Sequence, residues 1–137
     1  IDCPPSLSLL TIMALVASDA LIVPLQTEFF ALEGLTQLMK TIDRIKSNLN
    51  PSLEIRGILL TMFDKRNKLS GQVEFEARNY FKEKVYSTVV PRNVRLSEAP
   101  SHGIPVLLYD KLCPGSKAYF KFTEEFLEQD KKVVSAA

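Results

Sequence analysis

The chain has 137 residues and a formal net charge of +1, because 17 lysines and arginines nearly balance 16 aspartates and glutamates. Hydrophobic residues make up 46% and charged residues 24%, which excludes a disordered, collagen-like or coiled-coil chain and predicts one globular domain. So small a net charge attracts neither DNA nor a membrane in bulk, so such binding would require a local patch. Two cysteines without metal-ligand spacing favour a reducing cytoplasm over a disulfide scaffold.

Apolar periodicity divides the chain into alternating helices and strands. In chain order we predict a helix at residues 6–17 capped by Ser6, a buried strand at 20–24, a long helix at 30–49 ended by Pro51, a buried strand at 55–62, a loop at 64–70, a helix at 73–81, a β-branched strand at 85–90, a loop at 91–110 with one helical turn at 95–99, a helix striped by aromatics at 119–126, and a frayed tail at 131–137. No apolar run approaches the ~18 residues of a membrane span.

The alternation of strands and helices predicts an α/β fold, with a parallel sheet that carries helices on both faces. Ligands of such sheets bind at the carboxyl ends of the strands, so we expect function in residues 3–6, 25–29, 63–70 and 91–100. The first residues, Ile1 and Asp2, are typical of the end of a strand. We therefore interpret the sequence as the carboxyl-terminal portion of a longer protein, with one domain over residues 1–130 and the tail after it.

Asp2 is the strongest local candidate for chemistry. A carboxylate just past a buried strand can hold a magnesium ion through water, because magnesium prefers a few carboxylates, retained waters and substrate phosphates. The alternative is that Asp2 only caps the turn at Pro4 and Pro5. Both interpretations stay open on local grounds.

Three motifs occur in order: DCPPS at residues 2–6, PLQTEFFALEG at 24–34 and PRNVRLSEAPS at 91–101. Together they resemble the ParA (Soj-type) chromosome- and plasmid-partitioning ATPases, a branch of the deviant Walker A P-loop proteins, from Ile1 to about Gln129. The resemblance implies the carboxyl-terminal part of a P-loop-type parallel sheet. It further implies a cytoplasmic, nucleoid-associated, ATP-dependent homodimer that binds double-stranded DNA without sequence preference, and a ParB-like partner that stimulates hydrolysis.

The same resemblance assigns roles to single residues. Asp2 matches the Walker B aspartate, which holds magnesium through water, and Met62, Pro91 and Asn93 match positions that cradle adenine and ribose. A flexible methionine and a rigid proline suit the apolar walls of a purine site, and asparagine offers amide donors and acceptors. The alternative is that Met62 is a core residue and Pro91 a turn former.

The chain also departs from the family. ATP binding there uses a glycine-rich loop and a lysine on the phosphates, but nothing in the chain resembles KGGxGKT and its 5 glycines form no cluster. The first switch, with the family's catalytic aspartate, is missing as well. We therefore expect the chain to carry the second switch, the base side and the DNA side, to contain no catalytic residue, and to be inactive alone.

Arg66 and Arg95 match arginines that the family uses on DNA, and Lys65, Lys68 and Arg92 lie near them in sequence. Guanidinium groups suit phosphate oxygens because they donate two hydrogen bonds in a fixed fork. The sequence therefore predicts a basic DNA-binding patch on a nearly neutral chain. The alternative is that these residues are solvated loop residues.

Three other functions are alternatives to a DNA-binding ATPase. A MinD-like membrane-cycling regulator ends in a basic amphipathic helix, for which KKVVSAA after Asp130 is too short, and we expect no membrane partner. A reductase of the nitrogenase iron-protein type needs a cluster-binding cysteine, and neither Cys3 nor Cys113 has a matching setting. An inert truncated paralogue that acts as an interaction partner stays open.

Overall fold

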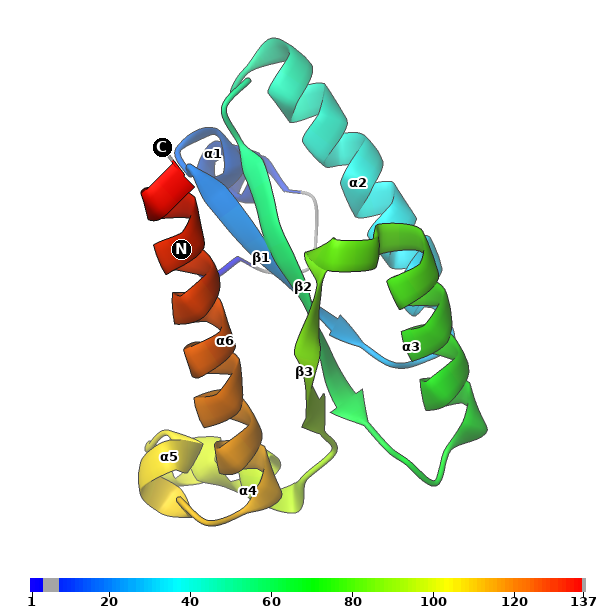
Figure 1. The fold of residues 1–137 in the computed structure, drawn as a ribbon, viewed down its shortest axis with the longest axis vertical. Coiled ribbons are helices and arrows are strands. Elements are labelled where there is room, and N and C mark those ends of the chain that lie inside the picture. The colour runs from blue at the N-terminus through cyan, green and yellow to red at the C-terminus, as the bar shows by residue number, and fades with distance from the viewer. Residues whose placement is uncertain (4–7, 137) are drawn as a thin grey trace.

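The centre of the molecule is a parallel three-stranded sheet with helices on both faces (Figure 1). The structure is a computed structural model that describes residues 1–3 and 8–136, with side chains as far as Lys131. The strands are β1 (Ala20–Gln26), β2 (Glu54–Phe63) and β3 (Val85–Pro91), which lie side by side in chain order. The predicted α/β class with a parallel sheet is confirmed.

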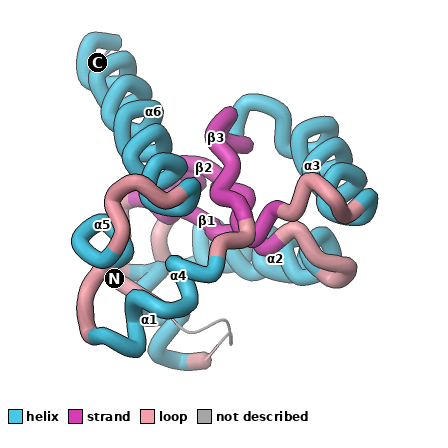
Figure 2. The backbone as a smooth tube through the Cα atoms, turned by 90° about the horizontal axis from the view of Figure 1, so that it is seen from below, coloured by secondary structure: helices cyan, strands magenta, loops and turns pink. Residues whose placement is uncertain are grey.

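Over residues 1–3 and 8–136, four longer helices pack around the sheet and four short ones follow α3 and β3. They are α1 (Leu9–Val16), α2 (Ala31–Asn48), α3 (Lys68–Phe81), η1 (Lys82–Lys84), α4 (Val94–Glu98), η2 (Ala99–His102), α5 (Val106–Tyr109) and α6 (Pro114–Ala136). Figure 2 shows α6 on one side of the strands and α2 and α3 on the other. Among the described residues, no helix is both long and apolar enough to cross a membrane.

The two faces of the sheet bury two separate sets of side chains, because successive residues of a strand point to opposite faces. Ile58 and Leu60 of β2 are fully buried toward α2 and α3, where they pack with Leu35. Leu59, between them, faces α6 together with Tyr86 of β3. The ring of Tyr86 meets that of Phe122 edge to face, with centroids 4.9 Å apart. The sheet is thereby held from both sides.

The structure differs from the sequence interpretation in several places. The strand at residues 20–24 is not buried on both faces, because β1 is an edge strand of the described sheet and its Ala20, Ile22 and Pro24 are exposed. Residues 1–3 are not in a strand, and the predicted cap at Ser6 lies outside the described residues. The predicted loop at 91–110 contains α4, η2 and α5, and α3 begins at Lys68 because the Asn67 side chain accepts a hydrogen bond from Leu69 N at 3.0 Å. Where a frayed tail was expected, residues 131–136 continue α6.

A contact with the sheet accounts for the length of α6. Asp130 of α6 forms an ion pair with Arg56 of β2. The guanidinium carbon of Arg56 lies 5.8 Å from the centre of the Phe126 ring, one turn earlier on the helix. Tail residues that follow such an anchored turn extend an existing helix, which costs less than starting a new one.

The Tyr86 ring of β3 lies directly against the backbone of Gly57 in β2. A Cβ atom at Gly57 would lie 2.3 Å from Cε2 of Tyr86, whose side chain is only 1% exposed and has no room to move. We expect Gly57→Ala to lower the free energy of unfolding by about 1–3 kcal/mol. Gly34→Ala is the control: its Cβ meets nothing within 4 Å on an exposed face of α2, so stability should rise by about 0.5–1 kcal/mol. Urea unfolding measures both, and equal effects would contradict the overpacking argument.

Candidate functional site at the carboxyl edge of the sheet

The carboxyl ends of the three parallel strands meet at one edge of the sheet. We call this the carboxyl edge: residues 26–28 after β1, 61–66 at the end of β2 and 91–95 after β3. Arg92 N donates to Phe63 O at 2.9 Å, and the Arg92 guanidinium pairs with Glu28 Oε1 at 2.9 Å. Arg92 therefore ties the segment after β3 to the segment after β1, across the end of β2.

Met62 has an unusual backbone conformation at this edge. Its φ angle is 55°, in the left-handed region that residues other than glycine rarely adopt. Such a conformation costs about 1–3 kcal/mol and is found most often at ligand and active sites. Because Phe63 pairs with Pro91, the structure brings Met62 and Pro91 onto neighbouring strand ends, both half-buried. Their contact with a base stays a prediction.

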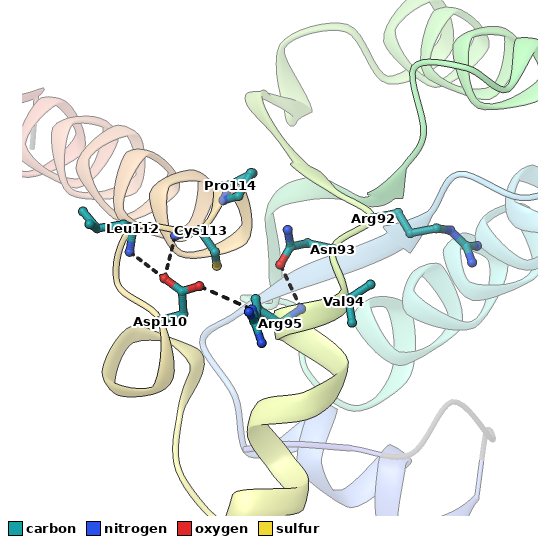
Figure 3. A pocket seen from close by; sticks show the side chains of 8 residues that line it. All are labelled: Arg92, Asn93, Val94, Arg95, Asp110, Leu112, Cys113 and Pro114. Carbon is teal, nitrogen blue, oxygen red and sulfur yellow. Dashed lines mark hydrogen bonds and ion pairs between the residues drawn. The ribbon is translucent and has the colours of Figure 1, made fainter.

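Asn93 begins α4. Its side-chain Oδ1 accepts a hydrogen bond from Arg95 N at 3.1 Å, which caps the helix and fixes the amide plane. This cap uses the oxygen of the amide and leaves the two Nδ2 hydrogens to point elsewhere. Asn93 is half-buried at the rim of a hollow of about 490 Å³ (Figure 3). The hollow is lined by Arg92, Asn93, Val94, Arg95, Asp110, Leu112, Cys113 and Pro114.

Arg95 is held by acidic and aromatic neighbours within its own chain. Its Nη1 lies 2.8 Å from Glu98 Oε2 and its Nε lies 3.5 Å from Asp110 Oδ2. The guanidinium carbon is 6.0 Å from the centre of the Tyr109 ring. The hydrogen bond to Glu98 raises the pKa of Arg95, which stays charged throughout. In Figure 3, Arg92 points away from Arg95 and Asp110, so the two arginines do not form one cationic cluster.

Arg66 lies in the turn after β2 and is 89% exposed. Its Nε and Nη2 donate to the two carboxylate oxygens of Asp64 at 3.1 and 3.0 Å, and its backbone N also donates to Asp64 at 3.0 Å. The hydrogen bonds from the Arg66 side chain and backbone lower the pKa of the Asp64 carboxyl to about 2. Arg66 is not among the residues that line the hollow. Arg66 and Arg95 are thus each paired with a carboxylate. That they form a DNA-binding patch together with Lys65, Lys68 and Arg92 stays a prediction.

Asp2 is exposed, and it is not brought together with the other predicted site residues. Over residues 1–3 and 8–136, no group of three His, Cys, Asp or Glu side chains could hold a metal ion. A single exposed carboxylate fits magnesium only as one contact, through water, beside phosphate oxygens. Of the three residues predicted to cradle a base, only Asn93 lines the hollow, with its amide hydrogens available, and Met62 and Pro91 are not among its lining residues. That the three residues hold a purine stays a prediction.

Sequence reasoning missed the acidic partners of the arginines. Asp64 beside Arg66, and Glu98 three residues after Arg95, stand at spacings that allow local pairing and could have been found. No local signal marks Glu28, which lies 64 positions before Arg92, or Asp110, which also accepts from Leu112 N and Cys113 N. These contacts depend on the folded arrangement of the strand ends.

The parallel sheet with its two helical layers is an α/β fold that solved structures of other proteins share. One solved structure with this fold is cobyrinic acid a,c-diamide synthase from Mycobacterium smegmatis with bound ATP analog and magnesium, which has a TM-score of 0.72 and 31% identity over 96% of this chain and 46% of its own. Another is the cell division ATPase MinD of Pyrococcus furiosus, with a TM-score of 0.75 and 23% identity over 94% of this chain and 51% of its own.

Sequence comparison identifies the family more closely. A family model described as an AAA domain matches residues 1–55. The chromosome partitioning protein ParA of Caulobacter vibrioides is 60% identical over 131 residues, which cover 96% of this chain and 49% of that protein. The sporulation initiation inhibitor protein Soj of Bacillus subtilis is 55% identical over 125 residues, or 91% of this chain and 49% of that protein.

The chain is thus a homologue of the ParA and Soj partitioning proteins, and the resemblance predicted from its motifs is confirmed. It spans about half the length of these curated relatives.

Proposed function

We propose that the chain supplies the base-binding and DNA-binding side of a nucleotide-switched, dimeric partitioning ATPase that binds DNA non-specifically during chromosome or plasmid segregation. The carboxyl edge carries this proposal, because it joins a strained Met62 to Pro91 and Asn93 in a homologue of partitioning proteins. Its place would be the cytoplasm, at the nucleoid.

ATP with magnesium is the proposed cofactor pair. Met62 and Pro91 would flank the purine, Asn93 would donate its Nδ2 hydrogens to the base or ribose, and Asp2 would hold magnesium through water. The ATP analog and magnesium bound to the M. smegmatis synthase support this proposal. The 5 glycines of the chain form no phosphate loop, so in a protein as long as the relatives the phosphates would be held by other residues.

Double-stranded DNA is the proposed partner of Arg66 and Arg95, and a ParB-like protein that of the ATP-bound homodimer. Both arginines lie after strand ends and expose their guanidinium groups, at 89% and 51% of the side chain. Contacts to phosphates carry no sequence information, which suits binding along a whole nucleoid. The likeness to MinD at 23% identity concerns the fold alone, and no observation favours a membrane-cycling role.

The test is whether the nucleotide state switches DNA binding in the full-length protein. Affinity for a random-sequence duplex is measured with ATP, with ADP and without nucleotide. We expect tight binding only with ATP, the same for duplexes of different sequence. Equal affinity with ATP and ADP would overturn the proposal. Binding to anionic vesicles instead of DNA would favour the membrane-cycling alternative, and failure to bind any nucleotide would favour the inert paralogue.

A further inference from the structure

The register of β3 against β2 shifts before β3 reaches the carboxyl edge. From Ile58 to Leu60, β2 advances two residues, while its partner β3 advances four, from Val85 to Val89. Residues 86–88 therefore form a bulge that takes up two extra residues of β3. Bulges bend a strand and re-aim the side chains that follow.

A second irregularity of opposite sense follows at once. From Leu60 to Phe63, β2 advances three residues while β3 advances two, from Val89 to Pro91. The extra residue now belongs to β2, and Met62 with its φ of 55° lies in this interval. The pairing of Phe63 with Pro91 is therefore the outcome of two irregularities, one in each strand.

The backbone groups of the β3 bulge find their partners in helices on opposite faces of the sheet. Glu125 of α6 accepts hydrogen bonds from Ser87 N and Ser87 Oγ, both at 2.7 Å, and from Thr88 N at 2.9 Å. Arg78 of α3 donates to Tyr86 O at 3.1 Å and to Ser87 O at 3.4 Å. We call Arg78 and Glu125 the bulge clamp. One member supplies acceptors and the other supplies donors.

Both members of the bulge clamp are fixed in turn. Arg78 pairs with Glu74 one turn earlier on α3, at 3.0 Å. Burial alone would raise the pKa of the Glu125 carboxyl, but the hydrogen bonds from Thr88 and Ser87 outweigh it and lower the pKa. Glu125 is therefore an ionised acceptor at neutral pH, and charge-assisted hydrogen bonds are the stronger kind.

The side chains of Tyr86 and Thr88 do not replace the hydrogen bonds of the bulge clamp. Among the described residues, Tyr86 Oη and Thr88 Oγ1 are buried without a hydrogen-bond partner. Arg78 and Glu125 form the hydrogen bonds to the backbone groups of the bulge that face the two helices, namely Tyr86 O, Ser87 N and Thr88 N. Unpaired backbone groups are costly, so loss of the clamp would favour a slip of β3 that restores regular pairing with β2.

We propose that Arg78 and Glu125 are positioning residues for the nucleotide base, because the bulge they hold determines which residues of β3 arrive opposite Met62. Regular pairing from Ile58 and Val85 onward would bring Val90 instead of Pro91 opposite Phe63, because the two irregularities together amount to a net shift of one residue. A one-residue slip turns every later side chain to the other face of the sheet. Pro91 would then leave the wall that it forms beside Met62, and Asn93 would start α4 from a different place. This inference rests on the proposed base site at the carboxyl edge and deepens it.

The test measures base selectivity in the full-length protein, as the ratio of the dissociation constants for GTP and ATP. These two ligands share ribose and phosphates, so the ratio reports the base side alone. We expect Glu125→Gln and Arg78→Lys to lower the ratio by about three- to tenfold, the worth of one or two displaced hydrogen bonds. Glu124→Gln on the exposed face of α6 and Arg44→Lys on α2 are matched controls that should leave the ratio unchanged.

Thermal melting of each variant separates positioning from stability. A lowered melting temperature with an unchanged ratio would overturn the inference, since the clamp would then only stabilise the fold. Should Glu125→Gln fail to fold, Ser87→Ala removes only the hydroxyl bond to Glu125 and should still lower the ratio, about twofold. Asn93→Ala is measured alongside. If it lowers the ratio and the clamp variants do not, the inference alone fails; if wild type does not discriminate between ATP and GTP, the base site of the proposed function fails with it.

Discussion

Replacing Arg66 or Arg95 by alanine in the full-length protein is expected to reduce the salt dependence of DNA binding, with a slope of log affinity against log salt that is shallower by about 2. Each phosphate contact releases close to one counterion, and an ATP-bound dimer would present each arginine twice. Within this chain, the net charge of +1 offers no bulk attraction that could replace the lost contacts. Arg66→Glu and Arg95→Glu add repulsion and are expected to abolish binding.

The acidic partners of these arginines do not prevent contacts with DNA phosphates. Arg66 would exchange Asp64 for a phosphate, and Arg95 would exchange Glu98 and Asp110. Exposed ion pairs contribute little to stability because water and salt screen them, so this exchange is inexpensive. A carboxylate beside each arginine would also keep the affinity moderate, which would suit the proposed release of DNA when the nucleotide state changes.

The measurement is a salt series of duplex affinities for wild type, Arg66→Ala, Arg95→Ala and the control Arg44→Ala, whose arginine is exposed on α2. ATP affinity is measured for each protein, since neither arginine belongs to the proposed base site and ATP binding should be unchanged. If the two slopes match that of wild type, Arg66 and Arg95 are solvated loop residues and the DNA surface lies elsewhere.

The sheet could be predicted from the sequence because its signal is local and strong. Residues 20–24 and 55–62 are mainly apolar runs, which predict parallel strands buried on both faces. The strands are present, but burial on both faces holds only for the middle of β2, because one face of β1 is exposed. The short helices between Val94 and Tyr109 were not predicted in full, because one or two turns carry no apolar period. Asn67 and Asn93 as helix caps were the usable signals, and both cap the next helix as such residues should.

The register of β3 could not be predicted from the sequence. The run of residues 85–90 fits any register with β2. In the observed register the bulge is hydrogen-bonded by Arg78 and Glu125, whose helices lie on either side of β3 in the chain. The same holds for Arg92 and Glu28, which meet only because the strand ends meet. Motif resemblance named Met62, Pro91 and Asn93, but which of their atoms are available follows from backbone geometry alone.

Asp2→Ala in the full-length protein is expected to lower the rate of magnesium-dependent ATP hydrolysis by about 10²–10³-fold, with little change in melting temperature. Phosphoryl transfer depends on neutralising the charge of the transferred group, and a magnesium ion held by few protein ligands loses much when one is removed. The described part of the chain has no cluster of three metal-ligating side chains that could compensate. Stability should hardly change, because Asp2 is exposed rather than part of the apolar core.

The dependence on magnesium distinguishes this role from that of a turn residue. Asp2→Asn keeps the shape of the side chain and its ability to accept a hydrogen bond in the turn, but it lacks the charge that holds a hydrated cation. A magnesium role therefore predicts that Asp2→Asn is as impaired as Asp2→Ala, and that both recover part of their activity when magnesium is raised. A turn role predicts a normal Asp2→Asn and a destabilised Asp2→Ala. Steady-state hydrolysis over a magnesium series, with thermal melts of the same samples, decides between them: normal hydrolysis by Asp2→Asn at limiting magnesium would remove Asp2 from the metal site.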